Sequence, residues 1–207
     1  VQRLHDQNFR VMISVWPKVN EESSVYKQFR DKGWLYLRNI YDGRKDWIGK
    51  GYTSTFYDPY QQSARQGFWD QMNEKLYKKG FDAWWMDASE PDVHSNINLE
   101  ERKAVFQPAI GSSVRYYNTF PLMNAKGIYE GQRDTDPNNR VFILTRSFFA
   151  GQQRYSPAAW SGDTSSPWND LRDQISAGVN FSMPGTPCCT LDAGCFLVEN
   201  RFHQPYA

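Results

Sequence analysis

Two aspartates follow aromatic segments at positions where they could act together. Asp87 comes directly after the run 81–86 (FDAWWM), and Asp163 follows the run 160–162 (WSG). Taken singly, Asp87 could cap a helix or pair with a lysine, and Asp163 could be a turn residue. Together they meet the needs of glycosidic bond cleavage, in which one carboxylate attacks or activates water and a second carboxyl protonates the leaving oxygen. The sequence does not give the separation of the two groups, so retention and inversion both stay open.

An arginine and several tryptophans could complete a sugar-binding site around these acids. Arg146 follows an apolar run, and a guanidinium can hold hydroxyls or a carboxylate through paired hydrogen bonds. A structural ion pair is the alternative for this residue. Tryptophan presents a flat apolar face with a polar edge, which suits the C–H face and hydroxyl rim of a sugar. Trp16, Trp85 and Trp160 are the candidates for that contact, with core packing as the alternative for Trp160.

The remaining potential ligands form no metal-binding pattern. Glu90 is expected to bond the backbone or an arginine near Asp87. The histidines near it and near the C-terminus stand alone, and three cysteines fit neither a zinc motif nor an even-numbered disulfide framework, so we expect reduced thiols in or near a strand. No phosphate loop or dinucleotide fingerprint occurs, and we expect no metal and no cofactor. These histidines and cysteines are His94, His203, Cys188, Cys189 and Cys195.

Composition excludes several classes of partner. Hydrophobic residues make up 40% and charged residues 23% of the 207 residues, which is typical of a folded chain. No run approaches the roughly 18 apolar residues of a membrane span. The net charge of +1 comes without a basic stripe, which argues against nucleic acid. Aromatic residues reach 16%, and this points weakly to carbohydrate.

Short apolar segments alternate with segments that have helical character. The predicted strands are 11–16, 81–86, 141–145, 158–160, and either 181–183 or 188–191. The predicted helices are 20–32, 59–79, 99–105, 112–129 and 167–177, the last capped by Ser166 with Pro167 at its first position. Residues 34–56 are an aromatic excursion that could contain a hairpin.

Strands separated by helices predict βα units and a parallel sheet. Candidate site residues follow strand after strand, which favours a (β/α)8 TIM barrel over a doubly wound sheet with one switch point. About five of eight units are visible. We therefore expect an α/β fold in which residues 1–207 are part of a (β/α)8 glycoside hydrolase catalytic domain truncated at both ends. The strand-end residues are Trp16, Asp87, Arg146, Asp163 and Asp192.

Several runs resemble glycoside hydrolase family 31, which includes α-glucosidases, α-xylosidases and transglycosylases. They are 84–91 (WWMDASEP), 144–147 (LTRS), 151–155 (GQQRY) and 160–163 (WSGD). The resemblance covers nearly the whole chain in the right order. The longer run 84–96 (WWMDASEPDVHSN) is similar in style to bacterial α-xylosidases that act on xyloglucan oligosaccharides.

The resemblance implies a (β/α)8 barrel and a retaining double displacement. It assigns the nucleophile to Asp87, the general acid/base to Asp163, and contacts with the sugar to Arg146, Trp160 and Asp192. The chain departs from the family pattern near its end, where Cys195 replaces a usual glycine. It also lacks a sugar-binding aspartate before the first strand and a histidine after the last.

The function implied by the resemblance is release of a terminal α-xylosyl or α-glucosyl residue from an oligosaccharide through a covalent glycosyl-enzyme intermediate. A transglycosylase of the same family is the alternative within catalysis. A non-catalytic carbohydrate-binding relative is the alternative outside it, and would be expected to lose one carboxylate. The oligomeric state and the cellular location stay open, with a periplasmic or secreted location in a bacterium as one expectation.

Overall fold

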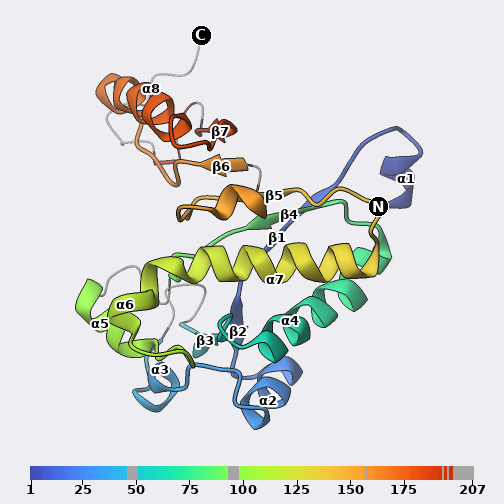
Figure 1. Cartoon of the computed structure of the whole chain (residues 1–207), viewed down its shortest axis with the longest axis vertical. Helices are drawn as coiled ribbons and strands as arrows, with labels where there is room; N and C mark the ends of the chain where they lie inside the picture. Colours follow the sequence, from blue (N-terminus) through green and yellow to red (C-terminus); the bar gives the residue numbers. More distant parts are fainter. Residues whose placement is uncertain (46–50, 93–97, 157, 193, 195, 198–207) are drawn as a thin grey trace.

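A parallel sheet runs through the centre of the molecule (Figure 1). The computed structural model describes residues 1–45, 51–92, 98–156, 158–192, 194 and 196–197. Within this part of the chain the sheet has the order β1-β4-β5-β6-β7, and every neighbouring pair is parallel. Strand order thus follows chain order, as a βα barrel requires. The strands are β1 (Met12–Val15), β4 (Ala83–Met86), β5 (Ile143–Thr145), β6 (Ala158–Trp160) and β7 (Cys189–Thr190).

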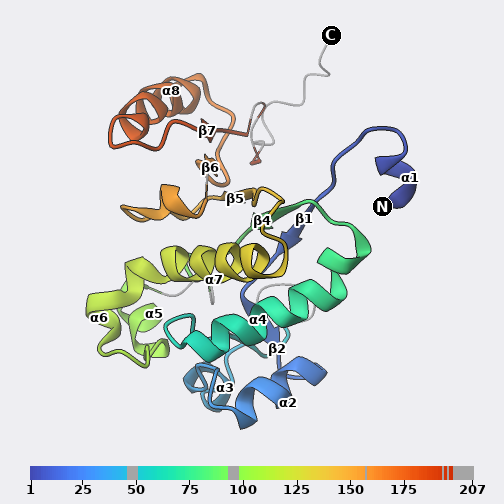
Figure 2. The same ribbon diagram turned by 45° about the vertical axis from the view of Figure 1, so that its right-hand side comes forward.

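Helices connect the strands and cover one face of the sheet. Both views show α4 and α7 side by side along β1, β4 and β5, with α8 beside β6 and β7 (Figures 1 and 2). Among the described residues of the crossover from β5 to β6, the only helical segment is the short 3-10 turn η3. No helix in the described part is long and apolar enough to cross a membrane. The connecting helices are α4 (Gln62–Lys75), η1 (Tyr77–Lys79), α5 (Leu99–Val105), α6 (Ser113–Tyr116), η2 (Tyr117–Thr119), α7 (Phe120–Thr135), η3 (Gln152–Arg154) and α8 (Trp168–Ser182).

The largest apolar cluster lies between this sheet face and the pair α4 and α7. Because side chains alternate along a strand, Trp84 and Met86 enter the cluster and Trp85 faces the other side. Trp69 of α4 packs directly onto α7 at Gly131, where a Cβ atom would lie 2.2 Å from the indole. The close approach of the two helices therefore requires glycine at this position.

A second unit of structure is inserted after β1. Strands β2 (Lys18–Asn20) and β3 (Ser54–Phe56) pair antiparallel, and helices α2 (Ser24–Asp31) and α3 (Arg38–Tyr41) lie between them in the chain. The buried carboxylate of Asp58 ties this unit together. It accepts hydrogen bonds from Tyr36 Oη (2.7 Å), the Tyr60 backbone N–H (3.1 Å) and the Ala109 backbone N–H (2.9 Å). At the other end of β1, α1 (Gln2–His5) is joined to the sheet by a contact of 2.8 Å between His5 Nε2 and Asp82 Oδ2.

Several predicted elements agree with the structure, and others need correction. The helix 99–105 and the strand 158–160 are confirmed with their bounds. The prediction of a helix from residue 20 is wrong, because Asn20 pairs with Ser54 in β2, and the helix begins only after Ser23 caps it. Within 34–56, where a hairpin was considered, an isolated antiparallel bridge joins Lys45 to Thr53, and β3 takes its strand partner β2 from before that segment.

The remaining corrections concern helix ends. The predicted helix 59–79 begins later, at Gln62, and its last turn is the separate 3-10 segment η1. The predicted helix 112–129 is broken into α6, η2 and α7, and α7 continues to Thr135. Ser166 does not cap α8, because Pro167 occupies the N-cap position and no side chain bonds the first turn. Helix α8 runs to Ser182, so the strand considered at 181–183 is wrong and the alternative at 188–191 contains β7.

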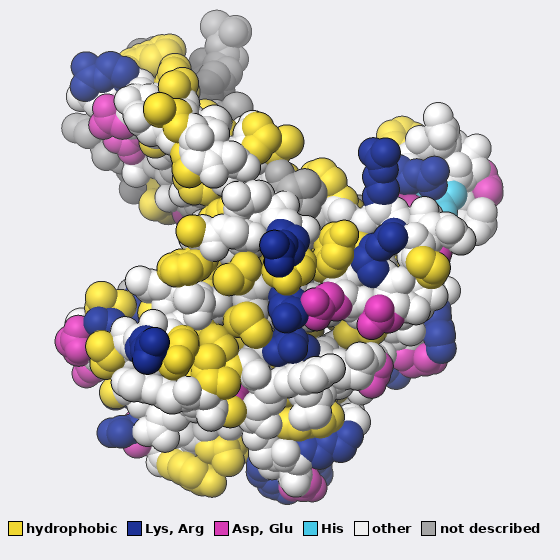
Figure 3. Space-filling view, viewed as in Figure 1, with side chains coloured by type: hydrophobic (Ala, Val, Ile, Leu, Met, Phe, Trp, Pro, Cys, Tyr) yellow, Lys and Arg dark blue, Asp and Glu magenta, His cyan; other side chains and the backbone are white. Residues whose placement is uncertain are grey.

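An apolar stripe along α8 is exposed to solvent. It consists of residues three or four apart along the whole helix, the spacing of one helical face. Trp168 is 83% exposed and Met183 80% exposed, and Figure 3 shows hydrophobic side chains gathered over this helix. The stripe, named here the α8 stripe, comprises Trp168, Leu171, Ile175, Val179 and Met183.

Candidate active site

The register of the sheet aligns four of the predicted site residues in one row. The row that contains Met86 and Ala159 turns toward the helices. The row one residue further along each strand therefore turns to the opposite face, which is the interior side of a barrel. This row comprises Trp16, Asp87, Arg146, Trp160 and Thr190.

Asp87 is placed by the last hydrogen bonds of β4 and by a tight turn. Its backbone N–H donates to the carbonyl of Val15 at 3.3 Å. The next residue, Ala88, is fully buried and has a φ of 51°, a left-handed conformation that is uncommon for alanine. The Ala88 backbone N–H donates to Asp87 Oδ1 at 2.8 Å. The turn thus orients the carboxylate that it follows.

Arg146 lies between the two predicted catalytic aspartates. Its Nε is 3.5 Å from Asp87 Oδ1, and its Nη1 is 3.2 Å from Asp163 Oδ2. Nε also donates to Glu90 Oε1 at 2.9 Å, and Nη2 lies 4.0 Å from Asp92 Oδ2. The expectation that Glu90 bonds an arginine near Asp87 is confirmed. One guanidinium therefore links the turn after β4 to the loop after β6.

The acids around Arg146 shift the pKa of two groups in the site. Burial would lower the pKa of Arg146, but the charges of Glu90, Asp87 and Asp163 outweigh it and the pKa is raised. The guanidinium thus stays charged. Burial raises the pKa of Glu90, and the contact with Arg146 offsets this only in part. The site therefore has a cation at its centre, and partly desolvated acids surround it.

Asp163 stands at the open side of the cluster. Its side chain is 43% exposed, against 17% for Asp87. The turn before it depends on Gly162, which has a φ of 84° and passes close to the Arg146 side chain. Asp192 lies near enough for the charge of Asp163 to add to the effect of burial in raising the pKa of Asp192. The loops after β6 and β7 thus bring a second pair of acids together.

The predicted tryptophans differ in how much of their side-chain surface is exposed. Trp85 and Trp160 meet edge to face, with ring centroids 5.5 Å apart. Trp160 is 6% exposed and Trp85 39% exposed, so core packing describes much of Trp160 and Trp85 presents the freer surface. Trp16 lies in the same row as Trp160, and the centroid of its ring is 5.1 Å from the ammonium of Lys18.

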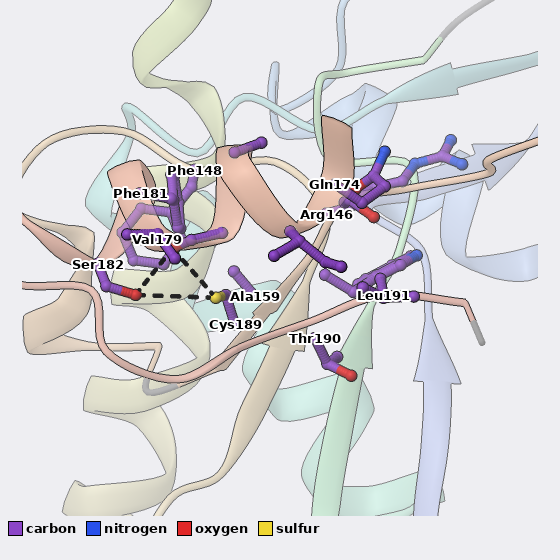
Figure 4. Close-up of a pocket in the computed structure, with 15 residues that line it drawn as sticks. Arg146, Phe148, Ala159, Gln174, Val179, Phe181, Ser182, Cys189, Thr190 and Leu191 are labelled. Atoms are coloured by element: carbon purple, nitrogen blue, oxygen red, sulfur yellow. Dashed lines mark hydrogen bonds between the residues drawn. The ribbon is translucent and has the colours of Figure 1, made fainter. Parts of the chain in front are cut away.

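A cavity of about 590 Å³ borders this cluster without containing it (Figure 4). Arg146 and Leu191 lie at one end, and Cys189 with Ser182 of α8 at the other. Most of its lining is apolar, and Ala159 and Cys189 belong to the row that turns toward the helices. The cavity therefore belongs to the layer between the sheet and α8, whereas the acids lie at the strand ends.

The described residues contain no cluster of potential metal ligands. No group of three or more His, Cys, Asp or Glu residues there could hold a metal ion. Cys188 and Cys189 are free and exposed, at and beside β7 as expected. His94, His203 and Cys195 lie outside the described residues.

Sequence reasoning did not identify the buried residues that bond the backbone of Asp87. Ser89, Asn124 and Tyr57 form a buried hydrogen-bonded chain that ends on the Asp87 backbone. One signal was present in the sequence, because Asn124 interrupts the apolar spacing of Phe120 and Ile128 on α7. A polar residue at an apolar helical position indicates a specific buried partner.

Comparison with known proteins agrees with the fold and the motifs. The model of the TIM-barrel domain of glycosyl hydrolases family 31 matches residues 1–206. An α-xylosidase of Saccharolobus solfataricus is 38% identical over 207 residues, which are 100% of this chain and 26% of that protein. The crystal structure of an α-xylosidase from Xanthomonas citri superposes with a TM-score of 0.94 at 51% identity, covering 98% of this chain and 22% of that one.

A third relative shows the same relation at lower identity. An α-xylosidase from a soil metagenome, solved with xylose, has a TM-score of 0.83 at 28% identity over 95% of this chain and 28% of its own. The chain thus spans about a quarter of the length of these relatives. The predicted partial (β/α)8 barrel is confirmed, and the chain belongs to glycoside hydrolase family 31, as part of its TIM-barrel domain.

Proposed function

We propose that residues 1–207 form part of a larger catalytic barrel that releases terminal α-xylosyl groups from oligosaccharides with retention of configuration. Asp87 is the nucleophile and Asp163 the general acid/base. The observation that carries the proposal is the position of Arg146, whose nitrogens lie 3.5 Å from one carboxylate and 3.2 Å from the other. Two carboxyl groups that share one guanidinium are close enough to act on the same bond.

The surroundings of Asp87 support its role as the attacking group. The contacts from Ala88 N–H and from Arg146 Nε both fall on Oδ1, which orients Oδ2 for attack on the anomeric carbon. Attack gives a covalent glycosyl ester, and the glycosidic oxygen leaves with a proton from the second carboxyl. The cation of Arg146 offsets part of the negative charge that two carboxylates bring into the site.

The position of Asp163 supports the second role. It lies in a loop and is the more exposed of the two acids, so a leaving group of variable size can approach it from the open edge. After the first step, Asp163 as a base removes a proton from water, which then hydrolyses the ester. An acceptor sugar in place of water would give transfer instead of hydrolysis.

The relatives support the choice of α-xylosides, because the two most identical ones described above are named α-xylosidases. The test is an assay of the full-length protein with aryl α-xyloside and aryl α-glucoside, with the product followed by ¹H NMR. We expect faster turnover of the xyloside and α-xylose as the first product. Turnover of the glucoside alone would contradict the substrate, and β-xylose as the first product would contradict retention.

A further inference from the structure

Three fully buried residues from separate elements form a chain of hydrogen bonds that ends at Asp87. Tyr57 follows β3, Asn124 lies in the N-terminal half of α7, and Ser89 belongs to the turn after β4. Tyr57 Oη donates to Asn124 Oδ1 at 2.6 Å, and Asn124 Nδ2 donates to Ser89 Oγ at 3.1 Å. Ser89 Oγ in turn donates to the backbone carbonyl of Asp87 at 3.2 Å.

The chain has one consistent direction. Burial raises the pKa of Tyr57, so its hydroxyl keeps its proton and remains a donor. The Asn124 amide accepts with its oxygen and donates with its nitrogen, and the Ser89 hydroxyl accepts and then donates. Each polar group in this apolar region is therefore satisfied by its neighbour, and removal of one member would leave the others without partners.

The last bond acts on the turn that aims the nucleophile. Asp87 is followed by Ala88 in a left-handed conformation, and strain of this kind persists only where the surroundings enforce it. Ser89 fixes the carbonyl of Asp87 on one side of Ala88, and the Asp92 backbone N–H donates to the carbonyl of Ala88 at 3.1 Å on the other. The direction of the Asp87 side chain thus depends on these backbone contacts.

A second buried amide on α7 provides a comparison within the same helix. Gln132 Oε1 accepts from Trp84 Nε1 at 2.7 Å, and both side chains are buried. Gln132 therefore joins α7 to β4 itself, whereas Asn124 joins the same helix to the turn that follows β4. Its partner Trp84 points away from the site face, whereas the partner of Asn124 bonds the nucleophile residue itself.

We propose that Asn124 is a positioning residue, which through Ser89 fixes the turn that aims the carboxylate of Asp87, with Tyr57 holding the amide in place. This inference rests on the proposed function of Asp87 as nucleophile. Through Tyr57, the inserted unit after β1 thus helps to set the geometry of the glycosylation step.

The test compares Asn124→Leu with the matched control Gln132→Leu in the full-length protein. Four quantities are measured: Tm, kcat and KM with good and poor leaving groups, and the rate at which a fluorinated α-xylosyl fluoride labels Asp87. We expect both variants to lose Tm by similar amounts. Only Asn124→Leu should lose kcat and labelling rate, by about 10- to 100-fold, because a misplacement of about 1 Å costs this much. The loss should be equal for good and poor leaving groups, with KM nearly unchanged.

A milder variant covers the case in which Asn124→Leu does not fold. Tyr57→Phe removes one hydroxyl and keeps the ring that stacks on Phe68, and it should slow labelling of Asp87 by a smaller factor. Tyr60→Phe is its control, since the Tyr60 hydroxyl bonds the carbonyl of Tyr116 instead. Label on Asp87 at an unchanged rate in Asn124→Leu and Tyr57→Phe would overturn the positioning role alone. Label on another residue in the wild-type protein would overturn the proposed function.

Discussion

Arg146 meets Glu90 with two nitrogens, Nε at 2.9 Å from Oε1 and Nη2 at 3.5 Å from Oε2. This pairing turns the remaining nitrogen, Nη1, toward Asp163 at 3.2 Å. The fork of the guanidinium therefore sets where the two predicted catalytic acids lie relative to each other.

Replacement of Arg146 by lysine should separate these contacts. A single ammonium cannot span Glu90 and Asp163 at once, although the charge is kept. We expect kcat/KM of the full-length protein to fall by about 100-fold or more, the scale of losing one donor in a preorganised site. Arg154→Lys, at an exposed position in η3, is the control and should behave like wild type. Near-normal activity of Arg146→Lys would contradict the bridging role.

The pKa of Glu90 leads to a prediction about stability and pH. Burial raises this pKa, so folding favours the protonated carboxyl. The resulting contribution to stability is present below the unfolded-state pKa and is lost as pH rises through the folded-state pKa. Glu90→Gln is neutral throughout, so its Tm relative to wild type should rise between about pH 4 and pH 7.

An exposed glutamate provides the control with opposite sign. The hydrogen bond from Lys78 lowers the pKa of Glu74, so its contribution is present at higher pH and is lost as pH falls. The Tm of Glu74→Gln relative to wild type should therefore decline slightly as pH rises to about 4.5 and stay constant from there to pH 7. A constant Tm difference for Glu90→Gln would show that burial does not dominate its titration.

Loss of Asp163 should depend on the leaving group. Without a proton donor, a poor leaving group departs slowly, whereas an activated phenol or a fluoride needs little protonation. Asp163→Ala should therefore lose most activity on oligosaccharides and least on the activated substrates. Asp87→Ala should lose activity on all of them. Equal losses for Asp163→Ala on good and poor leaving groups would contradict its role as the acid.

The α8 stripe leads to a prediction about the isolated chain. An exposed apolar helix face is a surface for association, so the 207-residue chain by itself should bind a hydrophobic dye or aggregate. Val179→Glu, within the stripe, should reduce dye binding of this chain. The same change should lower Tm of the full-length protein if other barrel elements cover the stripe. Asn180→Glu, outside the stripe, is the control. A monomeric chain that unfolds cooperatively without binding dye would contradict the prediction that the exposed α8 stripe is a surface for association.

The site could be predicted where it depends on strand ends. Parallel strands bring their carboxyl ends to one edge, so the spacing of Asp87, Arg146 and Asp163 was enough to place them together. Local chemistry also predicted that Glu90 would bond either the backbone or an arginine, and its side chain bonds Arg146. The start of α2 could not be predicted in this way, because Asn20 belongs to a strand whose partner lies more than thirty residues further along the chain.

The hydrogen-bonded chain that ends at Asp87 was even harder to predict from the sequence. Ser89, Asn124 and Tyr57 come from three elements, and their bonds join residues 35 and 67 positions apart. Sequence periodicity reports which face of a helix is apolar, and it flags Asn124 as an exception without naming its partner. Only the packing of α7 between β4 and the inserted unit decides that partner.

The configuration of one product tests the central assignment most directly. Azide added to the Asp163→Ala variant of the full-length protein can replace water as the group that attacks the glycosyl ester. If Asp87 is the nucleophile, two successive inversions occur, and ¹H NMR should show an α-glycosyl azide. A β-glycosyl azide from this variant would mean a single inversion, and would contradict the roles given to Asp87 and Asp163.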